Sequence, residues 1–192
     1  MKAIVQDRYG SADVLELRDI PDPVVGDEDV LVRVRAAGCG PDVWHLMTGL
    51  PYSVRLMPGF HKLRAGVRGR DVAGVVQAVG AKVTGLHAGD EVMGIVEGSF
   101  AELGLGRPDK LVRKPARLSF EEAAAVPISG LTALQAIRDV GKVGAGEKVL
   151  VIGAAGGVGT LTVRSRRPSG PRSRVCAADR RRTWCVRSGP TR

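Results

Sequence analysis

A glycine-rich turn, set between an apolar run and a helix-like segment, constrains the fold of this sequence more than any other feature. Residues 148–152 are apolar in the middle, which is typical of a strand buried in a parallel sheet. The run Gly153-Ala154-Ala155-Gly156-Gly157-Val158-Gly159 follows directly, and residues 160–163 can open a helix. A strand, a glycine-rich turn and a helix start together form the context that a dinucleotide-binding motif requires.

The glycines of this turn have distinct physical roles. Gly156 lets the backbone approach a pyrophosphate, Gly159 lets the helix pack closely on the strand, and the free N–H groups of the first helical turn bind the phosphates. A tight turn without a ligand is the alternative, because Ala154 replaces the first glycine of the usual Gly-x-Gly-x-x-Gly pattern. The predicted cofactor-binding residues of the turn are Ala154, Ala155, Gly156, Gly157, Val158 and Gly159.

Residues 1–118 show short strand-like segments separated by glycine and proline turns. In residues 30–35 the side-chain type alternates at every second position, which indicates a strand with one buried face. Many short strands with regular glycine turns favour a small β-barrel or sandwich. The other predicted strands are Lys2–Gln6 and residues 14–18, 72–79 and 91–96.

The pattern changes to helical near residue 118. Ser119 and Glu122 have the spacing of a capping box, in which each side chain satisfies a backbone N–H group at a helix start. Pro127 interrupts this first helix. Residues 130–140 are predicted to form a second helix, with Gly141 as its stop.

The formal net charge of +9 belongs to the end of the chain. Residues 164–192 hold ten arginines and one acid, Asp179, whereas basic and acidic groups balance in the residues before them. Nucleic-acid binding would therefore have to depend on this basic segment alone. No run is long and apolar enough for a membrane span. The N-terminal residues show no long apolar segment followed by a small-residue cleavage site, so we expect no secretory signal. Three cysteines form no disulfide framework, so we expect a reduced, cytoplasmic protein.

Four blocks of sequence carry a family resemblance in their order and spacing. They are Gly69-Arg70-Asp71-Val72-Ala73-Gly74-Val75-Val76 with Val79-Gly80, then Gly89-Asp90-Glu91-Val92, then Pro127 through Thr132-Ala133, and then residues 149–159. Together with the N-terminal strands, these blocks resemble the medium-chain dehydrogenase/reductase superfamily. The alanine-containing glycine motif is most similar to that of its zinc-independent quinone oxidoreductases and enoyl reductases.

The resemblance implies a fold and an activity. It implies a GroES-like β-barrel that contacts the substrate, followed by a Rossmann domain that binds NAD(P)H, in a mixed α+β and α/β architecture. The implied reaction is hydride transfer to a quinone, enone or carbonyl, and the intact family suggests a homodimer. The implied site residues are Trp44, His45 and Tyr52 as candidates for the substrate pocket, and Thr132 near the nicotinamide. Packing beneath the barrel is the alternative role for the three pocket candidates.

The resemblance does not extend to a zinc site. Cys39 and His45 lie in a stretch that looks superficially like Cys-Gly-x-Asp-x-His of zinc alcohol dehydrogenases. The second zinc ligand of that family, a histidine, is replaced by Arg70, and the third, a cysteine, by Ser129. We therefore expect no metal, and we interpret Cys39 as a small apolar residue in a valine-like position.

Residues 164–192 do not continue the family pattern. Their arginine, proline, serine and glycine content is typical of GC-rich coding DNA read out of frame. Reading from the third base of the Ser165 codon permits Ala-Lys-Ala-Phe-Gly-Ala-Glu-Val-Thr-Gly-Val-Cys, which has the helix end, turn and strand expected at that point. The recovered strand ends without an acid, which favours NADP(H) over NAD(H).

The predicted organisation has three parts. Residues 1–118 form the barrel, residues 119–163 supply linking helices and the first strand and turn of an incomplete Rossmann domain, and residues 164–192 form a basic tail that is disordered or out of frame. We expect an oxidoreductase that is inactive or impaired in this form. A non-catalytic GroES-like binding module, or nucleic-acid binding through the arginine-rich tail, are the alternatives.

Overall fold

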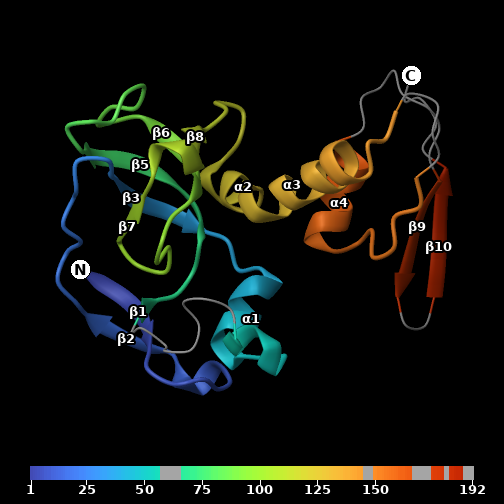
Figure 1. Ribbon diagram of the computed structural model, residues 1–192, viewed down its shortest axis with the longest axis horizontal. Helices are drawn as coiled ribbons and strands as arrows, with labels where there is room; N and C mark the ends of the chain where they lie inside the picture. The colour runs from blue at the N-terminus through green and yellow to red at the C-terminus, as the bar shows by residue number, and fades with distance from the viewer. Residues whose placement is uncertain (57–65, 145–148, 166–173, 180–181, 188–192) are drawn as a thin grey trace. The chain divides into compact units, whose positions relative to one another are not determined.

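The computed structural model describes residues 1–56, 66–144, 149–165, 174–179 and 182–187 (Figure 1). Backbone contacts divide the chain into two compact units, Met1–Pro127 and Ile128–Arg192, and each is described by itself. No helix in these described ranges is long and apolar enough to cross a membrane.

A five-stranded antiparallel sheet forms most of the first unit (Figure 1). The apolar cluster at its centre is dominated by valines, because β-branched side chains pack well on a pleated surface. The strands, in their order across the sheet, are β7 (Leu103–Gly106), β3 (Val30–Ala37), β5 (Asp71–Val79), β6 (Glu91–Ile95) and β8 (Leu111–Arg113).

The sheet confirms strands at three of the predicted positions, with one difference. β3, β5 and β6 coincide with predicted segments. In β3, however, Val30, Leu31 and Val32 are all buried, so both faces of the strand are covered at its start. The expected alternation of buried and exposed residues begins only at Arg33, which is exposed.

A smaller three-stranded sheet lies in the same unit. It has the order β2 (Glu16–Asp19), β1 (Lys2–Gln6) and β4 (Gly66–Val67), and β1 confirms its predicted bounds. The second predicted strand, 14–18, is replaced at its start by a 3-10 turn, η1 (Ala12–Val14). An isolated bridge between Ala3 and Ala101 joins β1 to the segment before β7.

Helix α2 (Phe120–Ala124) belongs to the first unit. Its capping box is confirmed, because the Glu122 N–H donates to Ser119 Oγ at 3.1 Å and the Ser119 N–H donates to the Glu122 carboxylate at 3.0 Å. The helix buries Ala123 and Ala124 against Met93 and other apolar residues of the sheet. This packing moves the boundary between the units from residue 118, where the composition changes, to Pro127.

Helices and a hairpin make up the second unit. α3 (Pro127–Leu134) starts three residues before the predicted helix, at a proline that is compatible with a first helical turn. It continues as a π-helical segment, η4 (Gln135–Val140), which ends at Gly141 as predicted. The remaining elements are α4 (Gly157–Arg164), β9 (Arg174–Asp179) and β10 (Arg182–Arg187).

Two expectations for this unit are corrected. Residues 149–152 form no strand, and Leu150 and Ile152 are 65% and 80% exposed. A buried parallel strand needs a neighbour on each side, whereas β9 and β10 pair, among the described strands, only with each other and in antiparallel order. Strand conformation in the described part of the tail also differs from the expected disorder. β-Branched and aromatic residues in this sequence favour a local hairpin.

Candidate functional site

The glycine-rich turn folds back on itself before α4. Gly153 has a positive φ of 76°, which L-residues with side chains rarely adopt. The Gly156 N–H donates to the Gly153 carbonyl oxygen at 3.0 Å, and Thr160 Oγ1 donates to the Ala154 carbonyl oxygen at 3.1 Å. These bonds close the turn and direct the start of α4.

Gly159 and Gly156 differ in what surrounds them. A Cβ atom on Gly159 would lie 2.2 Å from the Gly153 carbonyl oxygen and 2.7 Å from the Ala154 Cα atom, so this position requires glycine for packing alone. A Cβ atom on Gly156 would meet only the Gly153 carbonyl oxygen, at 3.4 Å, which is an ordinary contact. The fold itself does not require glycine at position 156, because no other atom of the described residues, apart from its chain neighbours, lies within 4 Å of such a Cβ atom.

The first turn of α4 presents backbone donors without helical partners. The first intrahelical bond runs from the Thr160 N–H to the Gly156 carbonyl oxygen at 2.8 Å, so the N–H groups of Gly157, Val158 and Gly159 precede the helical ladder. No side chain of the described residues caps this end. Such an end, with open space beside Gly156, fits a phosphate or pyrophosphate.

The other predicted residues of the turn and of α3 are placed as follows. Ala154 is buried and Ala155 is exposed. Gly157 faces Ser129 of α3, whose Oγ atom would lie 2.9 Å from an added Cβ atom. Thr132 is exposed on α3, and its hydroxyl donates to the Ile128 carbonyl oxygen at 2.8 Å. The hydroxyl oxygen of Thr132 can still accept a hydrogen bond.

Helix α1 (Pro41–Thr48) carries two of the three pocket candidates. Trp44 is 48% exposed, and its ring contacts His45 in a T-shaped arrangement with a centroid distance of 5.0 Å. His45 Nδ1 lies 2.6 Å from the Leu50 carbonyl oxygen. Because a carbonyl oxygen only accepts, Nδ1 carries the hydrogen, and Nε2 is the nitrogen available to a ligand.

The third candidate, Tyr52, belongs to a neighbouring 3-10 segment, η2 (Tyr52–Leu56). It is 70% exposed, and Arg55 lies over its ring at 4.9 Å and over the Tyr9 ring at 4.4 Å. Arg55 also donates to the Gly49 carbonyl oxygen, next to the end of α1. Within the described ranges, no ring contact joins Tyr52 to Trp44. The structure therefore brings Trp44 and His45 together and holds Tyr52 through Arg55.

Sequence reasoning did not select Arg55. Its spacing of three residues from Tyr52 is a weak local signal, and its contact with Tyr9 depends on the tertiary fold.

The residues considered for a metal do not form a cluster. Across the described segments there is no group of three or more histidine, cysteine, aspartate or glutamate side chains placed to hold an ion. Cys39 is an exposed free thiol, which does not fit its interpretation as a small apolar residue in a valine-like position. Cys39 lies between the end of β3 and the start of α1, in a segment outside the strand. Arg70 is exposed and Asp71 is buried.

Comparisons with known proteins agree on one family. Residues 26–135 match the alcohol dehydrogenase GroES-like domain. The chain is 35% identical to human quinone oxidoreductase over 173 residues, which cover 88% of this chain and 50% of that protein. It is 36% identical to tomato 2-methylene-furan-3-one reductase over 175 residues, which cover 85% of this chain and 43% of that protein. The chain thus spans about half the length of the curated relatives it matches.

Solved structures give the same result. The quinone oxidoreductase from Coxiella burnetii superposes with a TM-score of 0.80 and 34% identity, over 92% of this chain and 56% of that one. Escherichia coli quinone oxidoreductase, solved in complex with NADPH, superposes with a TM-score of 0.78 and 26% identity. That match covers 92% of this chain and 52% of the other.

Proposed function

Because this chain belongs to the medium-chain dehydrogenase/reductase superfamily, in its quinone oxidoreductase-like branch, we propose that it carries the barrel and cofactor turn of an NADPH-dependent reductase. The reaction is hydride transfer to a quinone, an enone or another carbonyl compound. The observation that carries the proposal is the open, uncapped start of α4 beside Gly156, which fits a pyrophosphate.

The residues that would hold the cofactor are those of the turn. The N–H groups of Gly157, Val158 and Gly159 would bind phosphate oxygens, and Gly156 leaves room for them. Bound NADPH would supply the hydride. NADPH is favoured over NADH by the acid-free strand recovered in the shifted reading frame and by the NADPH complex of the E. coli relative.

The substrate side of the reaction is proposed for the first unit. Trp44 and Tyr52 offer exposed aromatic faces for a flat ring, and His45 Nε2 is available for a hydrogen bond. Thr132 is proposed to lie near the nicotinamide. Electrophilic help comes from hydrogen-bond donors and not from zinc, since Arg70 and Ser129 stand where zinc enzymes of the family have ligands.

The substrate class, the cellular location and the oligomeric state are proposed from the relationship to quinone oxidoreductases. We expect a small-molecule substrate and a cytoplasmic location, with a homodimer for a full-length relative. For residues 164–192 we propose a shifted reading frame, and we therefore expect the 192-residue chain to be impaired as a catalyst.

The direct test of this function uses the protein with the reading frame restored after residue 164. NADPH oxidation with duroquinone and with an enone should be detectable, and Gly156→Val should weaken NADPH binding because its side chain fills the open space. Thr160→Ser is the matched control, since it keeps the hydroxyl that donates to the Ala154 carbonyl oxygen. Absence of NADPH oxidation with both acceptors by the restored protein would refute the proposal.

A non-catalytic binding module is the second candidate. The observation that favours it is that the first unit has two apolar clusters of its own, one containing Val72 and the other Ala73, and also contains the exposed Trp44 and Tyr52. This alternative predicts binding of quinones without NADPH oxidation, even in the restored protein.

A further inference from the structure

The hairpin of the second unit places two cysteines directly opposite each other. Strands β9 and β10 are antiparallel, and their register pairs Cys176 with Cys185 (Figure 1). Directly opposite residues of an antiparallel pair belong to the same face of the ribbon and have Cα atoms about 4.5 to 5.5 Å apart. A disulfide joins residues whose Cα atoms are about 4.4 to 6.8 Å apart. The register therefore places the two cysteines at a separation that a disulfide can span without a movement of the backbone.

The residue pairs on either side of the cysteines differ in charge. Asp179 is paired with Arg182 beside the connection between the strands, and opposite charges stabilise such a pair. Arg174 is paired with Arg187 at the other end, and like charges directly opposite each other are destabilising. The open end of the hairpin is therefore its weaker end, and a covalent bond between the strands near that end would hold them together.

The two arginines of the open end also favour thiol–disulfide exchange. Because strand residues alternate between faces, Arg174 belongs to the same face as Cys176, and Arg187 belongs to the same face as Cys185. The thiolate is the nucleophile in this exchange, and neighbouring arginines favour the thiolate form. Arginines also attract anions. The class of reagent that fits this face is therefore an anionic disulfide of low molecular weight, such as oxidised glutathione.

From this placement we propose that Cys176 and Cys185 form a redox-active dithiol that exchanges with such a disulfide and closes into an intrachain disulfide. One thiolate attacks the reagent, which forms a mixed disulfide and releases one reduced thiol. The second thiolate attacks the sulfur of the first cysteine and releases the other half of the reagent as a thiol. The two cysteines are oxidised, the reagent is reduced, and the two thiol protons end on the released thiols. An excess of reduced thiol reverses the reaction.

This dithiol is a property of the 192-residue chain. It lies within residues 164–192, for which we propose a shifted reading frame, and it does not depend on the reductase function.

The test equilibrates the 192-residue chain in buffers with defined ratios of reduced to oxidised glutathione, followed by an acid quench and mass spectrometry. The expected product is a chain that has lost two hydrogen atoms and carries no glutathione. Because trypsin cuts after arginine, the expected fragment is residues 175–180 joined to residues 183–187. The titration gives the ratio of reduced glutathione squared to oxidised glutathione at which half of the chain is oxidised.

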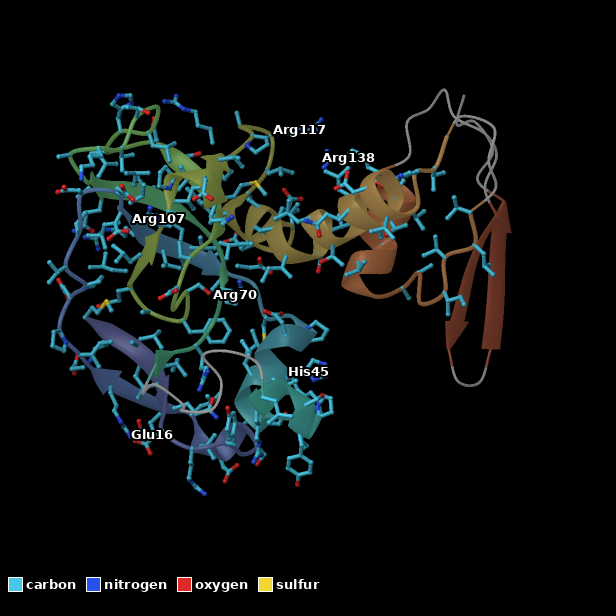
Figure 2. The ribbon with its side chains drawn as sticks, in the orientation of Figure 1. Glu16, His45, Arg70, Arg107, Arg117 and Arg138 are labelled. Atoms are coloured by element: carbon cyan, nitrogen blue, oxygen red, sulfur yellow. The ribbon has the colours of Figure 1, made fainter. Side chains whose placement is uncertain are left out.

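Two variants separate the effect of the register from the mere presence of cysteines. Cys39→Ser should leave the titration unchanged, because Cys39 lies in the first unit, before α1, the helix that carries His45 (Figure 2). The exchanged variant, Cys185→Val with Val186→Cys, keeps the composition but moves the cysteine opposite Val175, to the other face of the hairpin. The half-oxidation ratio should be about tenfold higher for the wild-type chain than for this variant.

A titration of the wild-type chain in concentrated urea supplies a comparison that does not depend on the folding of a variant. Urea should lower the half-oxidation ratio about tenfold, because the unfolded chain no longer holds the two cysteines opposite each other. Equal ratios for the wild-type chain with and without urea would overturn the proposal. So would a persistent mixed disulfide with glutathione, a main product that links either cysteine to Cys39, or the absence of any reaction.

Discussion

At the scale of single residues, Gly156 and Gly159 are both glycines of one motif, but different neighbours restrict them. An added Cβ atom at Gly159 would clash with backbone atoms of Gly153 and Ala154, which cannot rotate away. An added Cβ atom at Gly156 would make only an ordinary van der Waals contact with the Gly153 carbonyl oxygen. Gly159 is therefore needed by the fold, and Gly156 remains available for a ligand.

Gly159→Ala should accordingly destabilise the turn and α4 by about 1–3 kcal/mol, the usual cost of overpacking. Gly156→Ala should leave both in place. Amide hydrogen exchange of α4 is the measurement, because it reports this helix separately from the first unit. Equal protection of α4 in the two variants would show that the steric interpretation is wrong.

The capping box of α2 supports a second prediction at this scale. Ser119→Ala removes the acceptor for the Glu122 N–H and should lower the free energy of unfolding of the first unit by about 1 kcal/mol. Glu122→Gln is the control, because its amide oxygen can still accept from the Ser119 N–H. Urea unfolding measures both, and an unchanged midpoint for Ser119→Ala would contradict the role of the cap.

At the scale of elements, local signals predicted local structure well. The α2 cap and the strand at Lys2–Gln6 were found because their determinants lie within a few residues. Strands β4, β7 and β8 were missed because they are short and are defined by distant partners. In β7, Gly104 passes so close to Val96 that an added Cβ atom would lie 2.8 Å from it. No local pattern shows such an approach.

The same argument explains the strand that was predicted but does not form. The apolar pattern at residues 149–152 is genuine, but a parallel strand is stable only between neighbours, and the described chain supplies none. The candidate site follows the same rule. The glycine turn could be predicted from its sequence, whereas the contact of Arg55 with Tyr9 depends on the tertiary fold.

Hydrogen exchange tests this account of residues 149–152. Their amides should exchange without protection in the 192-residue chain, while those of β5 in the central sheet should be strongly protected. Restoring the reading frame should protect them, because the neighbouring strands are then present. Protection comparable to that of β5 in the 192-residue chain would contradict the prediction.

At the scale of the whole molecule, the first unit has the central sheet and apolar clusters of a barrel domain, whereas the described residues of the second unit include the glycine-rich turn but no parallel sheet. Exposed apolar side chains at Leu150 and Ile152 follow from this difference. We propose that the turn contacts a pyrophosphate, but the elements that would hold the rest of a dinucleotide are not found in the described part of the second unit.

A titration with NADPH, followed by the change in its fluorescence, tests the central claim most directly. The 192-residue chain and the frame-restored protein are compared under the same conditions. The account predicts negligible binding by the 192-residue chain and saturable, micromolar binding by the restored protein. Micromolar binding by the 192-residue chain would show that its second unit already forms a working cofactor site, and would contradict the account.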